Sequence, residues 1–108
     1  MIFADEYRKL IAERKSISDE IDYDDNPVIA ESVKLFCEHM DEAILFVKNE
    51  CTADDIIWLS EILDEIVSRS QSKTFLMAVG QTAEKYPEVV REYNIKYFID
   101  SAEEFFHS

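Results

Sequence analysis

The sequence predicts an all-α protein of five to six helices arranged in antiparallel pairs. The 108-residue chain has only one glycine and two prolines. It contains neither Asn-Gly nor Asp-Gly, the dipeptides that β-hairpin turns favour. Apolar residues recur at three- and four-residue steps, which is the period of an amphipathic helix. At this length we expect residues 1–108 to form a single helical domain.

The first half of the chain predicts two helices. The first covers about residues 2–14, and its apolar stripe continues to Ile21. The second covers residues 27–49, with Asn26 as its N-cap and Pro27 at its first helical position. Its core face consists of Ile29, Val33, Phe36, Cys37, Met40, Ile44 and Val47.

A third helix is predicted over residues 53–70. Thr52 is a favourable N-cap, and Asp54 and Asp55 stand in the first turn, where carboxylates interact well with the helix dipole. The core face of this helix consists of Ile56, Leu59, Leu63, Ile66 and Val67.

A fourth helix is predicted over residues 73–86. Gly80 costs about 1 kcal/mol in a helix interior, so either a neighbouring backbone approaches closely there or the helix breaks.

The C-terminal stretch is less regular. Pro87 can begin a short helix over residues 87–93, and Asn94 fits a C-cap or turn. We expect residues 93–99 to be helical or an extended connection, and a last short helix, capped by Asp100 or Ser101, to run to about residue 106. These elements suit either a bundle or a small HEAT-like stack of helices.

The acidity of the chain is concentrated in one stretch. Residues 19–65 contain 15 Asp or Glu and only two Lys, so this stretch carries the whole formal charge of −13. Like charge at such density costs stability through self-repulsion. The pattern therefore favours a surface that meets a basic partner.

No motif for catalysis or cofactor binding is present. A single glycine excludes glycine-rich phosphate loops, and two histidines cannot build a His-rich zinc site. We expect no enzymatic activity, no cofactor and no metal. The two cysteines and a start without an apolar signal region indicate a cytoplasmic protein with reduced thiols. A negative surface would not bind nucleic acid or anionic membranes.

The candidate site is a protein-binding surface. Asp54, Trp58, Glu61 and Glu65 are spaced to share one stripe of the third helix, where a tryptophan among carboxylates has the composition of an interface hot spot. The alternative is that Trp58 packs beneath the first helix or a C-terminal element. The full set of predicted partner-binding residues is Asp22, Asp24, Asp25, Glu31, Glu38, Asp41, Glu42, Asp54, Asp55, Trp58, Glu61 and Glu65. For any one acid taken alone, the alternative is an ordinary solvated helix face, and the block as a whole is stronger evidence than its members.

The second half of the chain resembles bacterial immunity proteins. The segments DDIIWLSE (54–61), QSK (71–73), AEKYP (83–87) and YNI (93–95) are similar in style to helical immunity proteins of contact-dependent growth inhibition systems. The likeness covers roughly half of the chain. The paired-tyrosine helix motif of the colicin type is missing, so no functional residue is carried over from that group.

The resemblance implies a stoichiometric inhibitor, or antitoxin. Such a protein binds one cationic nuclease toxin domain, for which we expect an EndoU-type RNase, and blocks its active site or a nearby surface. Two alternatives remain open: a helical-repeat adaptor or scaffold that binds a basic protein or peptide, and an enzyme with a carboxylate or metal site.

Overall fold

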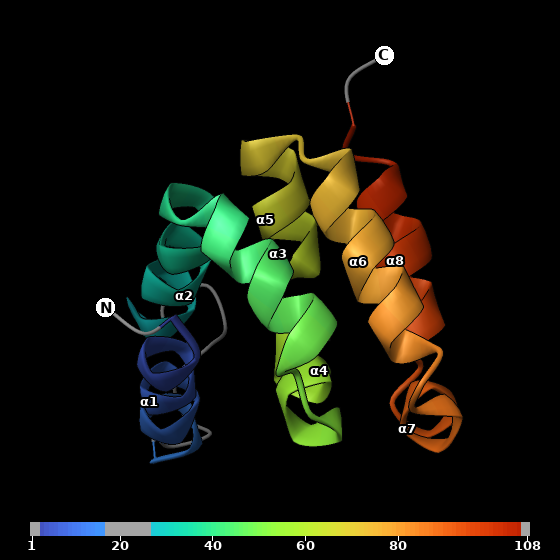
Figure 1. Ribbon diagram of the computed structural model, residues 1–108, viewed down its shortest axis with the longest axis horizontal. Helices are drawn as coiled ribbons and strands as arrows, with labels where there is room; N and C mark the ends of the chain where they lie inside the picture. The colour runs from blue at the N-terminus through green and yellow to red at the C-terminus, as the bar shows by residue number, and fades with distance from the viewer. Residues whose placement is uncertain (1–2, 17–26, 107–108) are drawn as a thin grey trace.

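The structure is a computed structural model that describes residues 3–16 and 27–106, and these residues form helices without any strand (Figure 1). The helices are α1 (Phe3–Ser16), α2 (Pro27–Glu38), α3 (Met40–Asn49), α4 (Ala53–Ser60), α5 (Leu63–Ser70), α6 (Lys73–Ala83), α7 (Pro87–Glu92) and α8 (Ile95–Glu103). The predicted all-α class is confirmed. The predicted number of five to six is too low, because the described ranges contain eight helices.

Two of the predicted long helices are each divided. The helix expected over 27–49 is interrupted at His39, where φ is −126° and ψ is 46°. This interruption lies where the chain changes neighbours, because α2 packs on α1 and α5 whereas α3 packs chiefly on α6. The helix expected over 53–70 is interrupted at Ile62, where φ is −111° and ψ is 7°. Ile62 and Leu63 are both fully buried at this interruption, and the neighbours of the chain change there, because α4 packs on α8 whereas α5 packs on both α8 and α2.

The C-terminal prediction is wrong in detail. Residues 95–103 form one helix, so Asp100 and Ser101 lie inside α8 and do not cap it. Asn94 adopts a left-handed backbone, with φ of 54°, and makes the turn between α7 and α8. Pro87 begins α7 as expected.

The predicted cap at Thr52 is confirmed. The Thr52 hydroxyl accepts a hydrogen bond from the Asp55 amide at 3.2 Å, and the Asp55 carboxylate accepts one from the Thr52 amide at 3.0 Å. This reciprocal pair is a capping box, which satisfies two amides that the first turn of α4 would leave unpaired.

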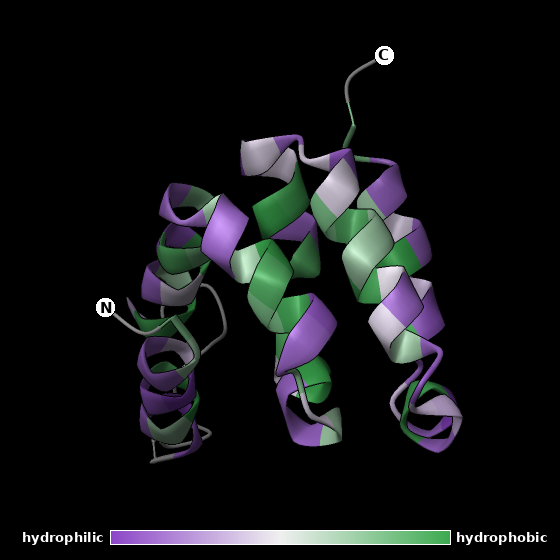
Figure 2. Cartoon of the chain, viewed as in Figure 1, coloured by the Kyte–Doolittle hydropathy of each residue, from purple (hydrophilic) through white to green (hydrophobic). Residues whose placement is uncertain are grey.

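Rows of helices pack against each other around one connected core. α3 packs against α6, α5 packs against α8, and α2 joins α1 to α5. Figure 2 shows apolar residues gathered where these helices face one another. Within the described residues, none of the helices is long and apolar enough to cross a membrane.

Phe36 stands at the centre of an aromatic cluster that joins α1, α2 and α6. Its ring centroid lies 4.9 Å from Phe3, 4.9 Å from Tyr7 and 5.7 Å from Phe75. The side chains of all four residues are buried. Edge-to-face contacts of this kind add to the free energy already gained from burying the rings.

We therefore expect Phe36→Ala to lower the free energy of unfolding by about 3–5 kcal/mol, because the cavity would open at this junction. Urea denaturation followed by circular dichroism measures the change. Leu45→Ala is the matched control: Leu45 is 59% exposed, so its truncation should change stability by less than about 0.5 kcal/mol. Equal losses in the two variants would contradict the central role of Phe36.

Candidate protein-binding surface

Acidic residues in and next to α4 pair with basic residues of α1. Arg8 pairs with Asp55 at 2.9 Å, Lys15 pairs with Asp54 at 3.1 Å, and Arg14 pairs with Glu61. The nearly neutral N-terminal segment of the sequence thus supplies cations to the acidic segment. Sequence reasoning missed these cations, although their grouping on one predicted helix was a usable signal.

Trp58 lies partly buried beneath the last turn of α1. The Arg14 guanidinium carbon is 4.8 Å from the centroid of the Trp58 ring, and the Lys15 ammonium nitrogen is 5.4 Å from it. Both distances fall within the range of cation–π attraction. This placement matches the alternative that the sequence left open, in which Trp58 packs beneath the first helix.

Asp55 is held inside the fold. Its side chain is only 4% exposed, and it accepts hydrogen bonds from Arg8 and from the Thr52 amide. Arg8 also donates to the carbonyl of Glu50 at 3.0 Å. Burial by itself would raise the pKa of Asp55, but the hydrogen bonds from Arg8 and Thr52 lower that pKa below its ordinary value. The carboxylate is therefore engaged in joining α1 to the start of α4.

The predicted four-residue stripe does not form, because α4 ends at Ser60. Glu65 belongs to α5 and lines a separate cavity of about 240 Å³ with Arg69 and Phe105. Asp54, Trp58 and Glu61 remain together against α1.

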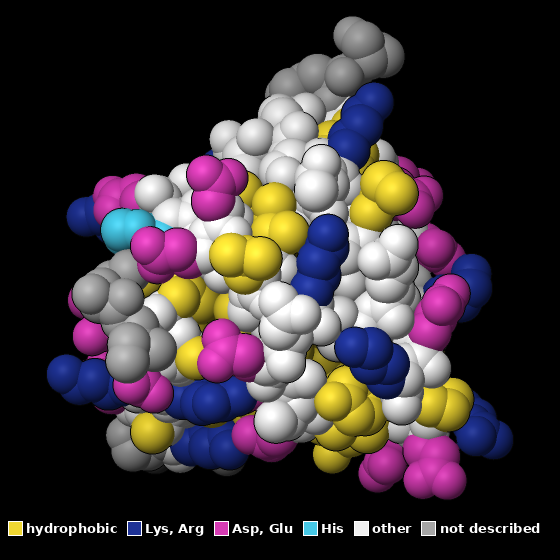
Figure 3. Space-filling view, viewed as in Figure 1, with side chains coloured by type: hydrophobic (Ala, Val, Ile, Leu, Met, Phe, Trp, Pro, Cys, Tyr) yellow, Lys and Arg dark blue, Asp and Glu magenta, His cyan; other side chains and the backbone are white. Residues whose placement is uncertain are grey.

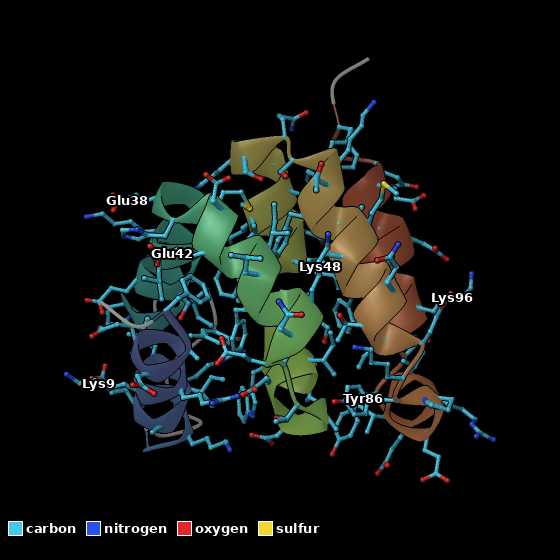
Figure 4. All side chains as sticks on the ribbon, in the orientation of Figure 1. Lys9, Glu38, Glu42, Lys48, Tyr86 and Lys96 are labelled. Atoms are coloured by element: carbon cyan, nitrogen blue, oxygen red, sulfur yellow. The ribbon has the colours of Figure 1, made fainter. Side chains whose placement is uncertain are left out.

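Four of the other predicted acids lie on α2 and in the first turn of α3. Glu31, Glu38, Asp41 and Glu42 are all exposed. Figure 3 shows acidic side chains over this part of the molecule, and Figure 4 places Glu38 and Glu42 there. Within the described residues, one of these four acids is in an ion pair: Lys34 approaches Glu38 at 3.9 Å. We call these four acids the α2–α3 corner.

The α2–α3 corner is a separate surface from the group formed by Asp54, Trp58 and Glu61 against α1. In Figure 1 the α2–α3 corner and α4 lie at opposite ends of α3, whose ten residues span about 15 Å. One continuous acidic patch, which side-by-side packing of the predicted helices would have made, is therefore absent from the described residues. Asp22, Asp24 and Asp25 lie outside the described residues.

A shallow groove between α1 and α2 extends the acidic surface. Its volume is about 270 Å³, and Leu10 and Leu35 contribute apolar surface to it. Charged residues from both helices also line the groove: Glu6, Lys9, Glu13, Glu31, Lys34 and Glu38. Apolar surface between carboxylates suits the long stems and charged ends of Lys and Arg.

A larger groove lies between α6, α7 and α8. Its volume is about 650 Å³, and Gly80, Pro87, Val90 and Ile99 contribute to its lining. Both explanations expected for Gly80 are wrong: α6 continues through it, and nothing lies within 4 Å of the position that a Cβ would take. Because Gly80 has no side chain, the wall of the groove is open at this position.

The thiols and carboxylates of the described residues are not arranged as a metal site. Within residues 3–16 and 27–106, no group of three or more His, Cys, Asp or Glu side chains could hold a metal ion. Cys37 and Cys51 are both free. Burial raises the pKa of the Cys51 thiol to about 12 and also raises the pKa of Cys37.

Comparison of the chain with protein-family models, curated proteins and solved structures finds no match.

The lowered pKa of Asp55 predicts a pH-dependent contribution to stability. Its contribution is fully present above the unfolded pKa of about 3.9 and is lost as pH falls through the lower folded pKa. We expect Asp55→Asn to lower the free energy of unfolding by about 1–3 kcal/mol at pH 7, and the difference from wild type to shrink toward pH 2. Urea denaturation at several pH values measures this difference. Asp54→Asn, which loses only an exposed pair, should cost less than about 1 kcal/mol; a pH-independent Asp55 effect would contradict the assignment.

Gly80→Ala should raise the free energy of unfolding by about 0.5–1 kcal/mol, because alanine is the better helix former and its methyl group meets open space. Thermal unfolding measures the gain. Ala78→Gly in the same helix is the reverse control: Ala78 is buried, so that substitution should be destabilising. A loss of stability in Gly80→Ala would show that the site is constrained.

Proposed function

We propose that this chain is an immunity protein that binds one basic nuclease toxin domain and blocks its active site or substrate groove. The observation that carries the proposal is the α2–α3 corner, where four carboxylates are exposed and, within the described residues, only Glu38 has a cation in ion-pair distance. In contrast, Asp54, Asp55 and Glu61 have cations of the same chain beside them. Among the described residues of the predicted site, the acids most available to a partner therefore lie on α2 and at the start of α3.

The chemistry of a nuclease supports this pairing. A nuclease needs a basic surface to hold phosphates, and exposed carboxylates can occupy the same countercharges. Electrostatic attraction also speeds association, which matters for an inhibitor that must bind a lethal enzyme quickly. The α1–α2 groove adds apolar surface beside the acids, where the stem of an arginine or lysine could pack.

The first test is co-expression with the toxin domain encoded immediately upstream. We expect the cells to be protected and a one-to-one complex to form at low salt. Toxicity that persists in the presence of the folded chain, with no complex at low salt, would overturn the proposal.

A second test locates the surface. We expect the triple variant Glu38→Gln/Asp41→Asn/Glu42→Gln to slow association with the toxin roughly tenfold or more at low salt, because it removes the steering charge. Stopped-flow or surface-plasmon kinetics measures the rate. The matched control is Glu88→Gln/Glu92→Gln/Glu103→Gln, which makes the same charge change at exposed positions of α7 and α8. Equal effects of the two triple variants would show that net charge matters and the α2–α3 corner does not.

One observation favours the second candidate, a small helical stack that acts as a peptide-binding adaptor. The groove of about 650 Å³ between α6, α7 and α8 has the size of an ordinary ligand site. Substitution Gly80→Leu would place a side chain in that groove. The adaptor function predicts loss of peptide binding in this variant, whereas the immunity function predicts unchanged protection.

A further inference from the structure

The layer formed by α3 and α6 is electrically neutral on a very acidic chain. The two helices pack side by side, in front of α5 and α8 in Figure 1. Together they contain two acids and two lysines, although the whole chain has a formal charge of −13. Leu45 and Met77 are 59% and 65% exposed, and Figure 3 shows hydrophobic side chains over this layer. A second copy of the chain meets little repulsion here, since salt screens charges more than about 8 Å away.

Three exposed residues of α3 form one stripe. Asp41, Leu45 and Lys48 follow one another at steps of four and three residues, which places them on one side of the helix; Figure 4 shows Lys48 on α3. Within the described residues, neither Asp41 nor Lys48 is in an ion pair. The stripe therefore carries an acid at one end, a leucine in the middle and a base at the other end.

This order of residues is complementary to itself when two copies of α3 run antiparallel. Asp41 of each copy then lies opposite Lys48 of the other, and the two Leu45 side chains meet at the centre. Because such a contact has two-fold symmetry, the opposite-charge pair occurs twice. A parallel arrangement would place like charges opposite each other, which is unfavourable. The charge pattern of the stripe therefore selects the antiparallel arrangement.

We propose that the α3–α6 layer is the contact surface of a homodimer in which the two α3 helices run antiparallel, with Leu45 at the centre and Met77 adding apolar surface from α6. Two helices of ten and eleven residues offer less area than an interface of standard size. The dimer is therefore weak, with a Kd on the order of 0.1 mM. Dimerisation covers Asp41, one of the four acids of the α2–α3 corner, so a basic partner that binds there competes with the second copy. The dimer itself does not depend on the proposed function.

Charge reversal tests the pairing, with sedimentation velocity of the full chain from about 10 µM to about 1 mM as the measurement. We expect Asp41→Lys to weaken dimerisation roughly tenfold or more, because it places two lysines opposite each other. Lys48→Asp should weaken it similarly, because it places two aspartates opposite each other. A mixture of the two variants restores both opposite-charge pairs, so we expect a heterodimer with a Kd within roughly threefold of the wild-type value.

General repulsion predicts a different result. Asp41→Lys reduces the net negative charge, so repulsion alone would make its dimer tighter than that of wild type. Glu92→Lys is the matched control, because it makes the same charge change at an exposed position of α7, and it should not weaken the dimer. The proposal is overturned if wild type stays monomeric at about 1 mM, if Asp41→Lys weakens the dimer no more than Glu92→Lys does, or if the two charge-reversed variants do not associate with each other.

Leu45→Ala gives a readout that does not depend on charge. Leu45 is exposed in the single chain, so its truncation should leave the fold intact, which circular dichroism confirms. In the dimer the two leucines meet, so we expect the variant to dimerise roughly threefold or more weakly than wild type. If the charge-reversed variants do not fold, this variant decides, and a Leu45→Ala dimer as tight as that of wild type overturns the proposal. These measurements use the chain alone, so their outcome is separate from that of the toxin experiments.

Discussion

The packing of α1 against Phe36 is the contact on which the arrangement of charges depends. Phe3 and Tyr7 approach the Phe36 ring edge-on, and this burial fixes which face of α1 turns toward the core. Once that face is fixed, Arg8 must lie beside the start of α4, and the following turns of α1 carry Arg14 and Lys15 over α4. An apolar contact thus decides which acids have a cation within reach.

This docking divides the acidic stretch into two chemically different parts. Near α4 the carboxylates have cations beside them, and one of them, Asp55, is buried with a lowered pKa. At the α2–α3 corner the carboxylates face solvent with one lysine among them. The Lys15–Asp54 pair is exposed on both sides, and such a pair contributes about 1 kcal/mol or less to stability, so its main effect is on where negative charge remains. Among the described acids of the predicted site, those without a cation of the same chain beside them lie mainly on α2 and at the start of α3.

The opposite side of the molecule has a different character. The groove between α6, α7 and α8 carries Glu84 and Asp100 together with Arg91 and Lys96, so its charges balance. Gly80 leaves this groove open at a cost in helix stability that no neighbouring atom explains. Binding of a basic partner to the acidic surface should weaken as salt is added, because salt screens the charges. Binding in the groove, whose charges balance, should depend less on salt, so the salt dependence of binding separates the two candidate functions.

The sequence by itself determined the all-α class, the core faces of the helices, the Thr52 cap and the location of the acidic stretch, because these follow from local periodicity and composition. Only the tertiary structure decided the interruptions at His39 and Ile62, since each depends on which neighbours a helix must meet. The tertiary structure also decided where the residues of the candidate site lie. Whether Asp54 and Trp58 face solvent or α1 depends on how α1 docks, and the spacing of residues within one helix holds no information about the helix that packs across it.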